Sequence, residues 1–108
     1  MEAKHTPGPW FITGGEMTKY VEARIGNRLL QEVAAVGPTV ADDGYGDQQQ
    51  ANARLIAAAP ELLEALQSLL KSFPTEDDMH IAGWEQSEID LACRDYEAAR
   101  AAVAKATQ

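Results

Sequence analysis

The sequence predicts an α+β fold, in which a small N-terminal antiparallel β-sheet precedes two long antiparallel α-helices. Residues 10–36 alternate apolar and polar side chains between glycine-containing turns, which is typical of paired strands. From residue 47 onward, leucines and alanines recur every three or four residues, which is typical of amphipathic helices. The length of 108 residues suits one domain, so residues 1–108 are expected to fold as a single domain.

Residues 1–46 are predicted to form an extended leading segment and a β-meander. Two prolines and a glycine within residues 1–9 exclude a regular helix there. Strand-forming runs follow at 10–13, 19–25 and 29–36. The Gly-Asn pair between the last two runs supplies the positive φ angles of a two-residue hairpin turn, so these strands are expected to pair antiparallel.

The first helix is predicted over residues 47–73. Asp47 with Gln50 fits an N-cap and its capping-box partner. Pro60 lies inside the helical pattern, where it either restarts a helix at its first turn or kinks one long helix. The unbroken apolar stripe favours the long kinked helix. That stripe consists of Leu55, Ala59, Leu62, Leu66, Leu69 and Phe73.

The second helix is predicted over residues 84–106, after an acidic connector at 74–84. Two helices with matching apolar stripes are expected to pack as an antiparallel pair and to cover the sheet, which alone would leave a face bare. The inward face of the second helix is expected to consist of Ile89, Ala92, Cys93, Tyr96, Ala99, Val103 and Ala106.

Composition and charge exclude several classes of function. The formal charge is −8, from nine basic and seventeen acidic residues, which disfavours duplex nucleic acid as the main partner. A small anion is not excluded, since two or three local arginines can hold it. The single cysteine, Cys93, permits no intrachain disulfide. Without an apolar run of about 20 residues or a signal-peptide pattern, the chain is expected to have no membrane contact.

The residues that catalysis or metal binding would need are scattered. His5, His80 and Cys93 lie in three separate regions without spaced partners, so no metal site is expected. No serine lies in a GxSxG elbow, and no glycine-rich phosphate-binding motif is present. The sequence therefore predicts a protein that is not an enzyme and needs no cofactor.

Two arginines next to the predicted hairpin turn form one candidate binding feature. Arg24 and Arg28 flank the Gly-Asn pair, and two guanidinium groups at one hairpin end can each bind phosphate oxygens through two N–H groups. The alternative is a pair of exposed charges that keep the sheet soluble.

The start of the first helix is a second candidate. Free backbone N–H groups and the helix dipole make a helix N-terminus attractive to anions. Asn52 can offer a donor and an acceptor to a base or ribose, and Arg54 can add positive charge. Alternatively, Asp47 occupies the same N–H groups as an ordinary cap.

Tyr45 is a third candidate. It lies between Gly44 and Gly46 in the least regular stretch of the chain, where its ring could stack on a nucleotide base. The alternative is a loop whose ring covers the sheet edge. Trp10 has the same two interpretations, and the core is favoured for it.

Two segments of the chain resemble a widespread group of short phage and prophage proteins. They are HTPGPW at residues 5–10 and ANARLIAAAPELLEAL at residues 51–66. Their order and the intervening β-rich region also match that group. The resemblance implies a phage origin.

The order of a small sheet and two long helices, the first beginning near Asn52, is also similar to the Thoeris anti-defence sponges. That family sequesters cyclic ADP-ribose signals made by host TIR-domain proteins, without cleaving them. Its members form dimers or larger oligomers with pockets between subunits. The resemblance implies that Asn52 contacts a base or ribose, that Arg24 and Arg28 contact phosphate, and that the protein works as a homo-oligomer in the host cytoplasm.

A different class of function remains open beside this one. Residues 55–108 carry a net charge of −6, with three consecutive acids at 76–78. Such a surface could dock on a basic host protein or mimic nucleic acid. The second hypothesis is therefore an acidic phage protein that inhibits a host complex by direct docking.

Overall fold

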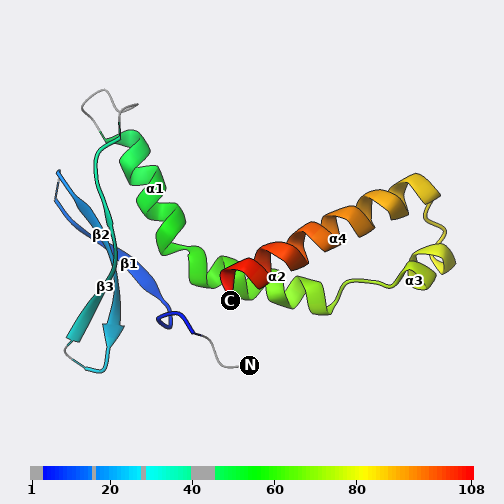
Figure 1. The fold of residues 1–108 in the computed structure, drawn as a ribbon, viewed down its shortest axis with the longest axis horizontal. Coiled ribbons are helices and arrows are strands. Elements are labelled where there is room, and N and C mark those ends of the chain that lie inside the picture. Colours follow the sequence, from blue (N-terminus) through cyan, green and yellow to red (C-terminus); the bar gives the residue numbers. More distant parts are fainter. Residues whose placement is uncertain (1–3, 16, 28, 40–45) are drawn as a thin grey trace. The chain divides into compact units, whose positions relative to one another are not determined.

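The computed structural model describes residues 4–15, 17–27, 29–39 and 46–108 and confirms the predicted α+β class. An N-terminal three-stranded antiparallel sheet is followed by helices (Figure 1). The chain divides into two compact units, Met1–Leu62 and Leu63–Gln108. The single domain expected for residues 1–108 stays a prediction, and each unit is described by itself.

The sheet of the first unit is the predicted meander. Strands β1 (Trp10–Gly14), β2 (Lys19–Ile25) and β3 (Leu29–Val36) pair in the order β1-β2-β3. The turn after β2 contains Gly26, whose φ of 66° lies in the left-handed region that glycine adopts without strain. Val21 pairs with Ala34 and Glu22 with Glu32, so Val33 is the extra residue of a bulge in β3.

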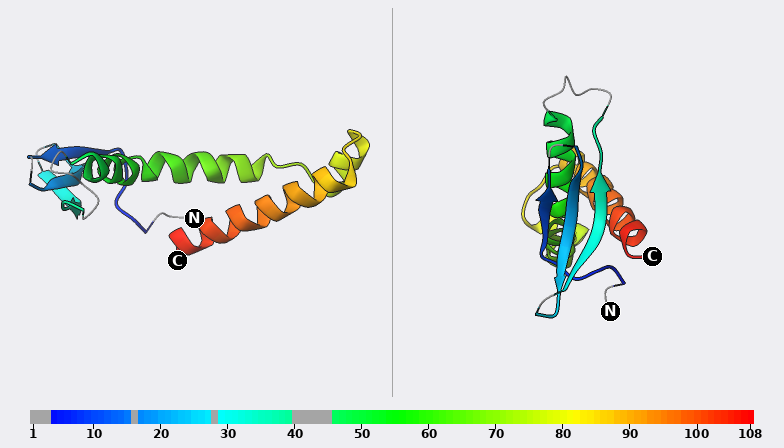
Figure 2. Two further views of the ribbon diagram at one scale, coloured as in Figure 1. Left: turned by 90° about the horizontal axis from the view of Figure 1, so that it is seen from above. Right: turned by 90° about the vertical axis from the view of Figure 1, so that its left-hand side faces the viewer.

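One face of this sheet packs on helix α1 (Asp47–Ala57) and forms the core of the first unit. Val21 and Val36 from the sheet and Ala53 from α1 are buried together. Trp10 is half-buried against this cluster, as predicted. Because Ala53 has only a methyl side chain, the helix backbone can approach the strands closely. Figure 2 shows α1 behind the sheet, with the other sheet face turned toward the viewer.

The predicted helix over 47–73 is wrong in one respect, because the structure has two helices there. α1 ends at Ala57, and α2 (Ala59–Lys71) follows after Ala58. Pro60 has no N–H to donate to the carbonyl of Ile56, so the helix cannot continue through it. Pro60 instead lies in the first turn of α2, where a missing N–H is tolerated.

The two phage-like segments meet at this break. Gly8 lies against the ring of Pro60, and a Cβ built at Gly8 would be 2.8 Å from the Pro60 Cβ. Nearby, the Trp10 indole N–H donates to the Thr6 carbonyl at 3.1 Å, and the His5 ring meets the Trp10 ring edge-on. Packing therefore explains part of why the two segments occur together.

The second unit contains a helix that the connector prediction missed. α3 (Glu76–Ile81) begins at a capping box in which the Asp78 N–H donates to the Thr75 hydroxyl at 3.1 Å. The spacing of Thr75 and Asp78 was a usable signal for it. The described chain thus has four helices where two were expected.

Helix α4 (Gln86–Ala106) follows the predicted second helix closely. Ile89 is buried, and the other predicted inward residues up to Val103 are partly buried. Ala106 is exposed, contrary to the prediction, because it lies in the last turn of the helix. Tyr96 stacks on Phe73 with ring centroids 4.8 Å apart. Among the described residues, no helix is both long and apolar enough to cross a membrane.

Candidate functional site

The amino end of α1 does not have the predicted cap. Asp47 is the first residue of the helix, and Gly46 is the N-cap with a left-handed φ of 74°. Glycine has no side chain to accept a backbone N–H, so no side-chain cap bond forms. The prediction that Asp47 caps the helix is therefore wrong, because the chain needs the positive φ of Gly46 to enter α1.

Gln49 anchors this end of α1 to the sheet. Its side chain is 1% exposed, and its amide donates to the Val36 carbonyl at 2.6 Å and to the Met17 carbonyl at 3.2 Å. A buried amide with two acceptors holds its element firmly, since losing either partner would leave a desolvated polar group. The inner side of α1 is thus fixed at Gln49 and at the buried Ala53.

Asn52 and Arg54 are exposed on the two flanks of α1, on either side of the buried Ala53. Neither side chain forms a hydrogen bond or ion pair with another residue of the described part of the chain. Leu55 follows them and is 65% exposed. Residues two apart in a helix lie about 160° apart around its axis, so the amide of Asn52 and the guanidinium group of Arg54 project from opposite flanks of this firmly anchored helix.

Arg24 is not close to the amino end of α1. Gln49 fixes that end beside Val36, whose partner across the sheet is Lys19. Arg24 lies five residues further along β2, about 16 Å away at the usual strand rise. It also points to the other sheet face, because the adjacent Ala23 is buried on the face that packs on α1.

Two further predicted residues cannot be placed. Arg28 and Tyr45 lie outside the described residues. Of the five predicted ligand residues, Asn52 and Arg54 share one helix, but their side chains project from opposite flanks of it. The sequence already indicated that Arg24 lies on a different face. Side chains alternate along β2, so Arg24 points away from the apolar face of Val21 and Ala23.

The sheet face away from α1 carries a mixed polar and aromatic surface that sequence reasoning did not weigh as a site. The Thr13 hydroxyl donates to the Glu22 carboxylate across β1 and β2. Phe11 and Tyr20 are half-buried on the same face. Arg24 belongs to this surface, beside the exposed Leu30.

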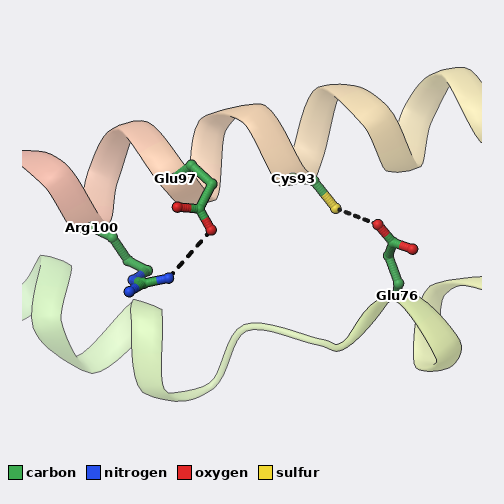
Figure 3. A network of polar contacts seen from close by, with 4 residues as sticks. All are labelled: Glu76, Cys93, Glu97 and Arg100. Atoms are coloured by element: carbon green, nitrogen blue, oxygen red, sulfur yellow. Dashed lines mark hydrogen bonds and ion pairs between the residues drawn. The ribbon is translucent and has the colours of Figure 1, made fainter.

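Cys93 behaves as the packed residue that the sequence predicted. Its thiol lies 3.5 Å from a carboxylate oxygen of Glu76 (Figure 3). Partial burial raises the pKa of Cys93, and the Glu76 contact and the negative charges of Asp90 and Glu97 raise it further. A raised pKa keeps the thiol protonated and therefore weakly nucleophilic at neutral pH.

Neither described histidine is grouped with other side chains that could bind a metal. The His5 ring lies 2.9 Å from the Thr6 carbonyl. His80 is exposed in the last turn of α3. Within residues 4–15, 17–27, 29–39 and 46–108, no three His, Cys, Asp or Glu side chains are grouped as a metal site requires.

Among the comparisons with known proteins, one family model matches this chain. The chain matches the family model described as Salmonella phage P22 protein Y8K6 over residues 1–108. Neither the comparison with curated proteins nor the comparison with solved structures finds a match. The predicted phage origin is confirmed at the level of the family.

Proposed function

We propose that this chain, which belongs to the family described as Salmonella phage P22 protein Y8K6, sequesters a nucleotide-derived immune signal of the cyclic ADP-ribose type. It would hold the signal in the host cytoplasm without cleaving it. The observation that carries the proposal is the exposure of Asn52 and Arg54 on the two flanks of a helix whose inner side is fixed by Gln49 and Ala53. Binding groups on a rigid element lose little freedom when a ligand arrives.

The chemistry of the pair suits such a ligand. The Asn52 amide can donate to and accept from a base edge or a ribose hydroxyl. The Arg54 guanidinium can donate two parallel N–H groups to one phosphate. Leu55 offers an apolar surface on which a base or ribose can rest.

A tight site buries most of its ligand, whereas this face of α1 is open. We therefore propose that another copy of the chain supplies the remaining wall, as the sponge resemblance implies. Arg28 and Tyr45 remain candidates for that wall. Arg24 would reach the ligand only from such another copy, because it lies on the opposite face and end of its own sheet.

The test is depletion and recovery of the ligand. Purified protein is mixed with cyclic ADP-ribose isomers and filtered, and the retained protein is heated to release what it held. The proposal predicts that the free ligand is depleted and that the heated sample returns it intact. Free ligand throughout, or recovery of a cleaved product, would contradict it.

Variants locate the site. Arg54→Ala should weaken binding about 10- to 100-fold, since a hydrogen bond to a charged group contributes roughly 1.5–3 kcal/mol, and Asn52→Ala about 5- to 100-fold, since it removes two neutral hydrogen bonds of roughly 0.5–1.5 kcal/mol each. Arg94→Ala is the matched control. It removes an exposed arginine of α4 whose ion pair with Asp95 is 3.8 Å long and largely solvated. It should leave depletion unchanged.

A second function is favoured by a separate observation. The three carboxylates of Glu76, Asp77 and Asp78 are exposed in the first turn of α3, and Glu85 and Glu88 add charge at the start of α4. This acidic end suits docking on a basic host protein. The Asp77→Asn variant, with raised salt as a parallel condition, should release such a host protein while leaving ligand depletion intact.

A further inference from the structure

The second unit contains an apolar groove between α2 and α4. Its volume is about 420 Å³, and its lining is almost entirely apolar. A second groove of about 410 Å³ shares Leu70 and extends along the last turns of α4. The walls of the first groove include Leu66, Leu69, Leu70, Phe73, Tyr96 and Ala99.

None of the side chains named for this groove is fully buried, and Leu69 is exposed. In residues 63–108, all of which the structure describes, Met79 and Ile89 are the buried apolar residues, and both belong to the α3 and α4 end. Helix α2 has no buried residue, and Leu69 in the groove is 68% exposed. An amphipathic helix gains its stability by burying its stripe, so this stripe requires a partner.

The charge distribution along α4 indicates what the partner is. Residues 85–97 carry five acids and one base, whereas residues 98–108 carry two bases and no acid. Two α4 helices placed parallel would set the two acidic halves against each other. If the two α4 helices are antiparallel, the basic end of each lies beside the acidic half of the other. Their helix dipoles then also run in opposite directions, which is favourable.

We infer that a second copy of this chain packs antiparallel into the α2–α4 groove, so that two helical hairpins form a four-helix bundle. The crossing is centred near Tyr96, the midpoint of α4. Arg100 and Lys105 then lie along Asp90 and Glu88 of the second copy. Alanines on α4, such as Ala99, let the helices approach closely. This inference does not depend on the proposed ligand.

Sedimentation equilibrium of the full chain, from about 1 µM to about 100 µM, tests the inference. A dimer is expected for the unaltered chain. Leu69→Arg places a charge in the groove of both copies and should weaken association about 100-fold or more. Monomer at every concentration, or a dimer unaffected by Leu69→Arg, would overturn the inference.

Leu91→Arg is the matched control. Leu91 is 50% exposed, belongs to the lining of neither groove and lies about 140° around α4 from Tyr96. It should leave the dimer intact. Circular dichroism checks that both variants keep their helices; if Leu69→Arg loses them, Leu69→Gln replaces it, with the same expected direction.

Disulfide cross-linking tests the antiparallel orientation. In a Cys93→Ser background, Gln86→Cys and Ala106→Cys occupy exposed positions at the two ends of α4. When the two variants are mixed, they should cross-link to each other, and neither should cross-link when alone. Efficient linkage within either variant alone would indicate a parallel pair and overturn the orientation.

Discussion

The apolar stripes of α1 and α2 differ in how far they are buried. In the first unit, α1 lays Ala53 on a sheet in which Val21 and Ala23 are fully buried. In the second, α2 buries no residue at all, although its apolar spacing is the more regular of the two. A periodic stripe therefore predicts that a helix has a partner surface, but it does not show whether that surface belongs to the same chain.

The largest expected effect tests the closed core of the first unit. Ala53→Asp would bury an unpaired carboxylate between α1 and the sheet, which should lower the free energy of unfolding by about 3–5 kcal/mol. Urea denaturation followed by circular dichroism measures this. The control Ala51→Asp changes an exposed position of the same helix and should lower it by less than about 1 kcal/mol. Equal losses for the two variants would show that α1 does not pack as described.

A smaller effect tests how the leading segment supports the start of α2. Gly8→Ala would place a Cβ 2.8 Å from the Cβ of Pro60, so the two segments must move apart. We expect a loss of about 1–3 kcal/mol in the free energy of unfolding. Gly37→Ala is the control, because nothing lies within 4 Å of its added methyl. A neutral Gly8→Ala would show that this contact does not contribute to stability.

The smallest effect concerns the reactivity of Cys93 in the second unit. Its raised pKa means that the thiolate fraction, and hence the rate of alkylation by iodoacetamide, rises only above the pH at which an ordinary cysteine ionises. Glu76→Gln removes a nearby negative charge and should shift this pH profile to lower pH. A profile that matches a free cysteine, or that does not move in the variant, would contradict the described contact.

Much of the first unit could be predicted from the sequence, because strand alternation and a Gly-Asn turn fix both pairing and faces. The helices were predicted less completely. Pro60 allows a kink or a restart, and only the surrounding packing decides between them. Asp47 resembles an N-cap in sequence, but the left-handed Gly46 takes that position.

The candidate site was predicted only in part. Asn52 and Arg54 lie on one helix, as predicted, but their two-residue spacing places the side chains on opposite flanks of it. Arg24 belongs to another element, and its distance from α1 depends on which face and which end of the sheet the helix packs on. Gln49 fixes that choice through bonds to Met17 and Val36, which are remote in sequence and carry no local signal.

Native mass spectrometry of the chain with cyclic ADP-ribose isomers tests the proposed sequestration most directly, because it weighs the protein, the ligand and the assembly together. The account predicts an oligomer that carries the mass of the intact ligand and loses it in Asn52→Ala. Spectra that show only bare protein at saturating ligand, or a bound mass that corresponds to a cleaved product, would contradict it.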